Sequence, residues 1–165
     1  MDTSEKITQR VSELITKYST SSKSVNYLLC DQYPATKLAY KIINENMEEY
    51  ALSYGELKTQ SVLIANGLKQ RGVKKGDRIA TLMGKSKEYI ITLLAIWRIG
   101  AVHVPLFTAF SAPAITFRVN GSNSKIVFCD QKQQSKLKPS DDFAPNGKVE
   151  VITTASFDQT PNWAF

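Results

Sequence analysis

The chain has 165 residues, enough for one ordinary domain with a buried core and few for two. Hydrophobic residues make up 42% of it and charged residues 22%, which excludes a disordered protein and is typical of a soluble globular one. No apolar run is long enough to cross a bilayer, so we expect no transmembrane segment.

Cysteine and histidine usage limits the possible redox and metal chemistry. Cys30 and Cys129 form no CxxC pair, and with a single histidine, His103, the chain has too few ligands for a Cys/His zinc site. The polar start MDTSEKITQR does not resemble a signal peptide. We therefore expect a cytoplasmic protein with two reduced thiols and no metal site.

The net charge of +6 raises the question of a nucleic-acid partner. Basic residues concentrate in residues 69–78, around a predicted turn, but no aromatic residues alternate with them as stacking platforms. We favour a solvated turn and expect no nucleic-acid partner. Attraction of anionic substrates is a second possibility, and nucleic-acid binding is a weaker third.

The first predicted element is an amphipathic helix over residues 2–18, followed by a Ser/Thr-rich link. The apolar face of this helix could pack on a core and carries Ile7, Val11, Leu14 and Ile15. We expect one partial domain, in which residues 1–24 form the helix and link and residues 25–165 form an α/β core.

The core begins with two extended segments, KLAYKIIN and EEYALSY, which surround a polar turn and predict a hairpin. Ser53 then precedes Glu56 by the spacing of a capping box, which predicts the start of a helix that ends at Gly72. The buried strand RIATLM follows. The next predicted helix, residues 86–99, is apolar around most of its circumference and ends at Gly100.

The remaining elements are a strand AVHVPLF, a helix with Pro113 in its first turn, a strand KIVFCD, a short polar helix QKQQSKL and a last strand KVEVITT. Strand–helix–strand units at this spacing predict parallel strands joined by right-handed crossovers. RIATLM, AVHVPLF and KIVFCD are continuous apolar runs, as expected for strands covered on both faces. The predicted fold class is therefore α/β, with a doubly wound, mostly parallel sheet flanked by helices.

Ligands of such sheets bind outside the carboxyl ends of the strands, where the loop MGKSKE is one candidate. Gly84, Lys85 and Ser86 precede a helix, as in a phosphate site. The loop lacks the longer glycine spacing of a P-loop, however. We therefore favour an ordinary strand-to-helix turn with Ser86 as the helix cap.

His103 is a second candidate, because it is the only histidine in the chain. It lies in an apolar strand, and the carboxylates of Asp77 and Asp130 could approach it only through the fold. No G-x-S-x-G nucleophile motif accompanies it. We expect His103 to be structural and Cys129, at a strand end, to be a small buried residue rather than a nucleophile.

Three stretches resemble a known family. The first, residues 51–83, combines the helix opening SYGEL with the turn GVKKGD, and the second, LLAIWRIGAVHVPLF, has the form L-A-x-x-x-x-G-A-x-x-x-P-L. KIVFCD fits the strand that usually follows. Over about residues 26–135, the chain resembles the AMP-forming acyl-CoA synthetases of the adenylate-forming superfamily.

The resemblance implies the first part of the large N-terminal domain of a fatty acid metabolism enzyme. That enzyme would activate a carboxylate with ATP and Mg²⁺ and transfer the acyl group to coenzyme A. The family's phosphate loop, adenine segment, ribose-binding Asp segment and catalytic lysine do not occur in these 165 residues. We therefore expect an N-terminal fragment that is inactive alone, holds none of these cofactors tightly and has the rest of the same polypeptide as its partner. The alternative is a free-standing α/β binding or assembly module without catalysis.

The resemblance also implies candidate binding residues, although no catalytic ones. In coenzyme A ligases the loop after the strand AVHVPLF lies near the path by which the thiol of coenzyme A enters. The resemblance therefore assigns four residues to that path: Phe107, Thr108, Ala109 and Phe110. Related short-chain enzymes often have glycines in this loop, and Thr108-Ala109 departs from that pattern. The charges of Lys132 and Lys136 could meet the nucleotide phosphates of coenzyme A.

Overall fold

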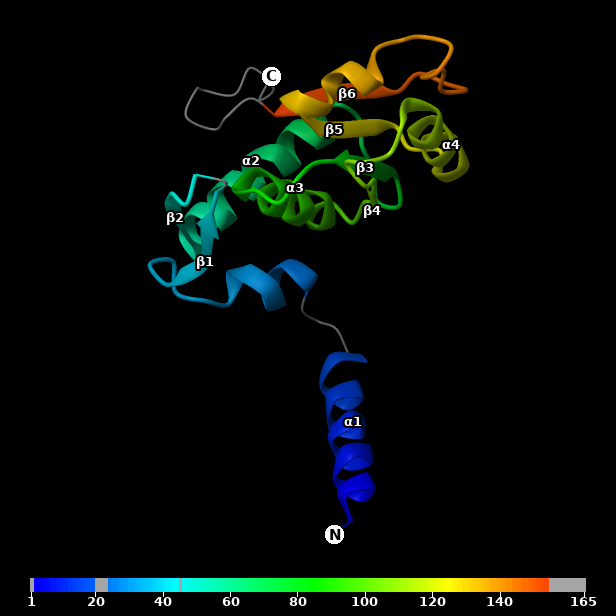
Figure 1. The fold of residues 1–165 in the computed structure, drawn as a ribbon. Coiled ribbons are helices and arrows are strands. Elements are labelled where there is room, and N and C mark those ends of the chain that lie inside the picture. Colours follow the sequence, from blue (N-terminus) through cyan, green and yellow to red (C-terminus); the bar gives the residue numbers. More distant parts are fainter. Residues whose placement is uncertain (1, 20–23, 45, 155–165) are drawn as a thin grey trace.

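The computed structural model describes residues 2–19, 24–44 and 46–154 (Figure 1). The first half contains helix α1 (Thr3–Ser19), the π-helical turn η1 (Tyr27–Asp31), strands β1 (Leu38–Ile43) and β2 (Glu49–Ser53), and helix α2 (Tyr54–Gln70). The second half contains β3 (Arg78–Leu82), α3 (Lys87–Arg98), β4 (Val102–Pro105), α4 (Ala112–Ser122), β5 (Ile126–Asp130), the 3₁₀ helix η2 (Gln131–Leu137) and β6 (Glu150–Thr154).

Four parallel strands form the central sheet, in the order β4-β3-β5-β6. Side chains alternate across it, so that Ile79 and Phe128 face the cluster with α2 and α3 while Ala80 and Val127 face the cluster with α4 and η2. Helical elements therefore cover both faces of the sheet. The prediction of a doubly wound α/β fold is confirmed.

Strand β4 differs from the prediction that both of its faces are covered. In the described chain it pairs with β3 alone and lies at the edge of the sheet, and Val102 is 48% exposed. The inner strands β3 and β5 are buried almost throughout. An apolar run indicates a strand here, but it does not distinguish an inner strand from an edge strand.

Helix α1 forms where the hydrophobic periodicity predicts it. None of its residues is buried, and Ile7 and Ile15 on its apolar face are 59% and 61% exposed. The helix stands apart from the sheet in Figure 1. The expectation that this face packs on a core is therefore not met within the described residues. No described helix combines the length and apolar character that a membrane crossing requires.

The hairpin and the helix after it follow local signals. Strands β1 and β2 pair antiparallel, as predicted. The Ser53 hydroxyl accepts a hydrogen bond from the Glu56 amide at 3.2 Å, and the Glu56 carboxylate accepts one from the Ser53 amide at 2.8 Å. The Ser53 hydroxyl also donates to the Glu56 carboxylate at 2.7 Å, and this bond and the one from the Ser53 amide lower the pKa of Glu56. The predicted capping box is therefore present in both directions.

Gly100 joins α3 to β4 through a left-handed backbone conformation with φ of +69°. Its carbonyl accepts a hydrogen bond from the Gly76 amide at 2.9 Å, and a Cβ atom would lie 3.0 Å from Lys75 Cγ. Both the dihedral angle and the close approach favour glycine at this position. The joint ties the turn before β3 to the start of β4.

An ion pair between Arg98 and Asp31 connects three helical elements. The guanidinium donates to both carboxylate oxygens of Asp31, at 2.6 and 2.9 Å, and its Nε donates to the Ser61 hydroxyl at 2.8 Å. The Arg98 and Asp31 side chains are only 11% and 21% exposed. The hydrogen bonds from Arg98 hold the pKa of Asp31 below its ordinary value. This bidentate pair fixes η1 against α2 and α3.

We expect Gly100→Ala to lower the free energy of unfolding by about 1–2 kcal/mol, because an L side chain is strained at positive φ. Urea unfolding followed by circular dichroism measures this difference. Gly121→Ala is the matched control, since nothing lies within 4 Å of its Cβ position on α4. This control should be neutral or stabilising by up to about 1 kcal/mol. Equal effects of the two substitutions would contradict the role of Gly100.

We expect Asp31→Asn to lower the free energy of unfolding at neutral pH by about 1–3 kcal/mol, because Arg98 loses a charged partner. The folded-state pKa of Asp31 is lowered, so its contribution is complete above the unfolded-chain value of about 4 and is lost as pH falls through the lowered pKa. The difference between variant and wild type should therefore shrink in acid. Glu13→Gln, in the exposed Arg10–Glu13 pair, is the control and should change little. A difference that persists unchanged at low pH would contradict the ion-pair explanation.

Candidate functional site

The loops that follow β3, β4 and β5 meet at the carboxyl edge of the sheet. The backbone amide of Gly84, in the loop after β3, donates to the Asp130 carboxylate at the end of β5 over 2.6 Å. The amide of Leu106, just after β4, donates to the Thr81 carbonyl of β3 at 2.9 Å. The three strand ends are thus tied together, at the position where open α/β sheets bind ligands.

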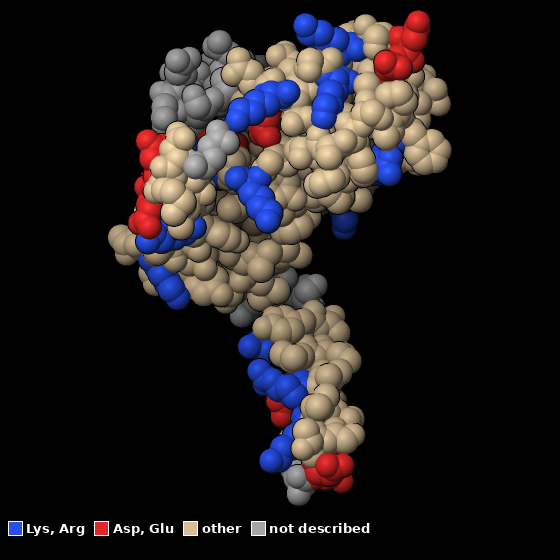
Figure 2. Space-filling view, viewed as in Figure 1, with Lys and Arg blue, Asp and Glu red and all other residues tan. Residues whose placement is uncertain are grey.

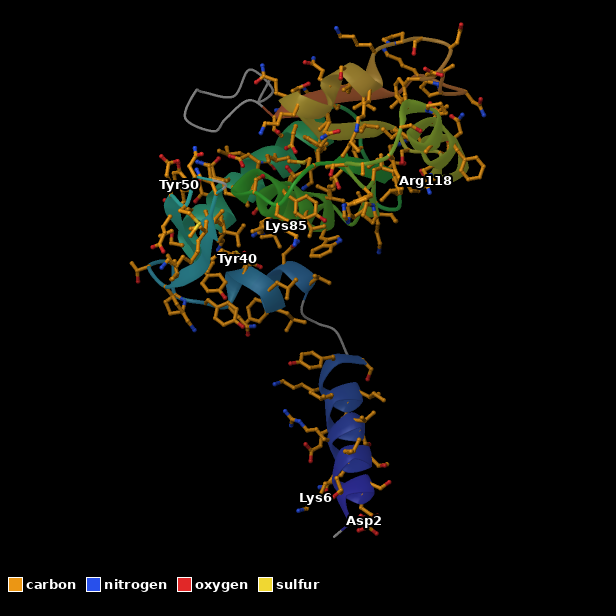
Figure 3. All side chains as sticks on the ribbon, in the orientation of Figure 1. Asp2, Lys6, Tyr40, Tyr50, Lys85 and Arg118 are labelled. Atoms are coloured by element: carbon orange, nitrogen blue, oxygen red, sulfur yellow. The ribbon has the colours of Figure 1, made fainter. Side chains whose placement is uncertain are left out.

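Residues 107–110 form a tight turn after β4. The Phe110 amide donates to the Phe107 carbonyl at 2.9 Å, and the two rings meet edge to face with centroids 5.8 Å apart. The guanidinium of Arg118, labelled on α4 in Figure 3, lies 3.9 Å from the centre of the Phe110 ring. Phe107 is 65% exposed. The turn therefore presents an aromatic surface to the outside.

The structure brings one predicted lysine to this turn. Lys136 of η2 donates from Nζ to the Thr108 carbonyl at 2.6 Å. Lys132 lies earlier on the same short helix and is exposed, as is Ala109 in the turn. The predicted loop and Lys136 are thus one continuous feature, although they are 28 residues apart in sequence.

His103 makes contacts within the scaffold. Its Nε2 lies 2.7 Å from the Thr81 hydroxyl on β3, and its ring meets the Tyr89 ring edge-on at 6.1 Å. Burial lowers the pKa of His103. Asp130 accepts from Gly84, and Asp77 pairs with a lysine at the opposite end of β3. These contacts agree with the structural role predicted for His103.

Cys30 and Cys129 are both buried and form no disulfide with each other. Burial raises the pKa of both Cys30 and Cys129, so the thiolate form is disfavoured at neutral pH. Cys129 is therefore the small buried residue that the sequence predicts.

The loop before α3 is an ordinary capped helix start, as predicted. The Ser86 hydroxyl accepts a hydrogen bond from the Tyr89 amide at 3.2 Å. Beside it lies a cavity of about 210 Å³, lined by Ile42, Ile43, Asn44, Tyr50, Lys85, Ser86, Lys87 and Glu88. Figure 3 labels two of these lining residues, Tyr50 and Lys85. Sequence reasoning missed this cavity, because no local signal shows that the hairpin packs beside α3.

The basic residues of the segment 69–78 are partly engaged within the chain. Arg71 pairs with Glu150 at 2.9 Å, and Arg78 donates to the carbonyls of Ser122 and Asn123 at 2.8 and 3.1 Å. On the face shown in Figure 2, Lys and Arg side chains are scattered over α1 and the core. Lys69, Lys74 and Lys75 are exposed, which agrees with the predicted solvated turn.

The described residues do not by themselves fit an ATP–Mg²⁺ site. Within residues 2–19, 24–44 and 46–154, no three His, Cys, Asp or Glu side chains gather as a metal site built from protein ligands alone would require. The glycine-rich phosphate segment of the adenylate-forming enzymes is also not part of this sequence.

Comparison with known proteins gives one consistent family. The family model described as "AMP-binding enzyme" matches residues 30–164. An acetyl-coenzyme A synthetase of Chlorobaculum tepidum is 49% identical over 85 residues, which are 52% of this chain and 13% of that protein.

Two solved structures have the same fold. The chain resembles an acyl-CoA synthetase of Brucella canis with a TM-score of 0.71 and 30% identity, over 81% of this chain and 24% of that one. It resembles a fatty acyl CoA synthetase of Mycobacterium tuberculosis with a TM-score of 0.59 and 28% identity, over 67% and 22%. The chain thus spans about a quarter or less of these proteins. Because the family model covers most of the chain, and the fold agrees, the chain belongs to the AMP-binding enzyme family.

Proposed function

We propose that this chain forms the first part of the large N-terminal domain of an AMP-forming acyl-CoA synthetase. In the complete enzyme, ATP-dependent activation of a carboxylate would release pyrophosphate, and coenzyme A would then take the acyl group. The observation that carries the proposal is the family match over residues 30–164. The doubly wound sheet and its resemblance to two acyl-CoA synthetase structures support it.

The part of the reaction assigned to this chain is guidance of coenzyme A. Phe107, Thr108, Ala109 and Phe110 would line the route by which the thiol reaches the acyl carbon, where correct placement accounts for much of the rate. The exposed aromatic surface at Phe107 suits contact with the uncharged, thiol-bearing arm of coenzyme A. Lys132 and Lys136, on η2 beside the turn, add positive potential that favours the nucleotide phosphates.

We further propose that the 165-residue chain alone does not form an acyl-adenylate. Three phosphates must be neutralised in that step, and electrostatic stabilisation of this kind supplies most of the catalysis. The segments with which the family does this do not occur in the sequence. ATP, Mg²⁺ and coenzyme A therefore belong to the complete enzyme, together with the remainder of the polypeptide.

The carboxylate and the cellular setting form the finer part of the proposal. The relative from Chlorobaculum tepidum is named for acetyl-coenzyme A, whereas the neighbour from Mycobacterium tuberculosis is named for fatty acyl CoA. We propose that the substrate is a carboxylate of fatty acid metabolism and that the protein is located in the cytoplasm. A panel of acids of increasing chain length discriminates between these substrates.

The second candidate is a free-standing binding or assembly module. It rests on the exposed apolar face of α1 and the edge strand β4, both of which could receive a partner protein. The same surfaces would also receive the remaining parts of a ligase domain. Only an activity measurement separates the two functions.

We expect the purified 165-residue chain, incubated with ATP, Mg²⁺ and acids from acetate to octanoate, to release no pyrophosphate above the no-acid control. A polypeptide that continues this chain through the family's phosphate loop to its catalytic lysine should release pyrophosphate and form an acyl-CoA with at least one acid. Release by the short chain would contradict its inactivity. If the long polypeptide released no pyrophosphate with any acid, this result would contradict the ligase proposal and favour the binding module.

A further inference from the structure

Two basic side chains from different elements contact the turn at residues 107–110. Lys136 of η2 donates to the Thr108 carbonyl at 2.6 Å. Arg118 of α4 places its guanidinium 3.9 Å from the Phe110 ring centre and also donates to the Ala114 carbonyl of its own helix at 2.7 Å. One cation thus holds the backbone of the turn, and the other holds its aromatic ring.

The other contacts of the turn lie within it or involve the Phe110 ring. Internally it has the hydrogen bond from the Phe110 amide to the Phe107 carbonyl and the edge-to-face contact of the two rings. Phe107 and Ala109 are exposed, whereas Phe110 is partly buried and packs against the buried cluster that contains Leu106 and Ile115. Segments with few buried contacts open locally at low free-energy cost. The two cationic contacts therefore add to the free energy needed to open the turn, beside the packing of Phe110.

We propose that Lys136 and Arg118 are positioning residues, which hold the turn at residues 107–110 closed over the carboxyl end of β4. The ammonium of Lys136 is only partly exposed and is bound to a carbonyl, so it acts through the turn. Arg118 acts through the face of the Phe110 ring. The inference rests on the proposed function only where it treats this turn as part of the coenzyme A route.

The two residues differ in what a conservative replacement preserves. An arginine at position 136 keeps charged N–H donors that can reach the Thr108 carbonyl. A lysine at position 118 keeps the charge but loses the flat guanidinium that lies over the ring. We therefore expect Lys136→Arg to retain a closed turn, whereas Arg118→Lys should retain it only in part.

Hydrogen exchange of the purified full chain, measured by mass spectrometry without any ligand, tests the proposal. Lys136→Met and Arg118→Met should each raise exchange at residues 107–111 by about three- to tenfold, the effect of losing one charge-assisted contact. Lys136→Arg should restore protection. Lys138→Met, an exposed lysine just after η2, is the matched control and should leave exchange unchanged.

Unchanged exchange at residues 107–111 in Lys136→Met would overturn the proposal. So would an equal rise in β3 and β5, because it would show that Lys136 stabilises the sheet rather than the turn. The measurement needs neither ATP nor coenzyme A. If the long polypeptide released no pyrophosphate, the proposed activity would be contradicted, but the role of Lys136 and Arg118 in the turn would not. If exchange stayed unchanged, their role would be contradicted, but the proposed activity would not.

Discussion

The fold depends on strand β3, which is buried on both faces and pairs in parallel with β4 on one side and β5 on the other. Parallel neighbours require crossovers, and crossovers are right-handed. The connection from β3 out to β4 and the one back across β3 to β5 must then lie on opposite faces, as α3 and α4 do. The loops before α3 and α4 diverge at the carboxyl end of the sheet, and that divergence creates the position where ligands bind.

Elements with local signals could be predicted from the sequence. Ser53 and Glu56 are three residues apart, so the sequence pattern itself predicts the capping box. Gly100 marks the end of the helix, because a left-handed backbone conformation favours glycine. The edge position of β4 could not be predicted. An apolar strand shows only that side chains are removed from water, and it carries no information about how many neighbours its backbone has.

The candidate site could be predicted only in part, because its contacts join distant residues. The resemblance pointed to residues 107–110 and to Lys136 separately, but the bond between them spans 28 residues. The contact of Asp130 with Gly84 spans 46 residues, and that of Arg98 with Asp31 spans 67. No periodicity or capping rule reaches over such separations. Side chains of this kind form pairs only after the crossovers have brought the elements together.

The net charge of +6 is a second case in which the sequence alone does not show which contacts a side chain makes. Several cations bind backbone carbonyls, which are left without helical partners at helix ends and in turns. Arg78 binds the carbonyls of Ser122 and Asn123 at the end of α4, and Lys136 binds that of Thr108. A side chain bound in this way keeps its charge but loses the freedom to follow a phosphate backbone. Charge counted from composition therefore says little about partners, whereas the carbonyls that the cations bind show which loops the chain holds in place.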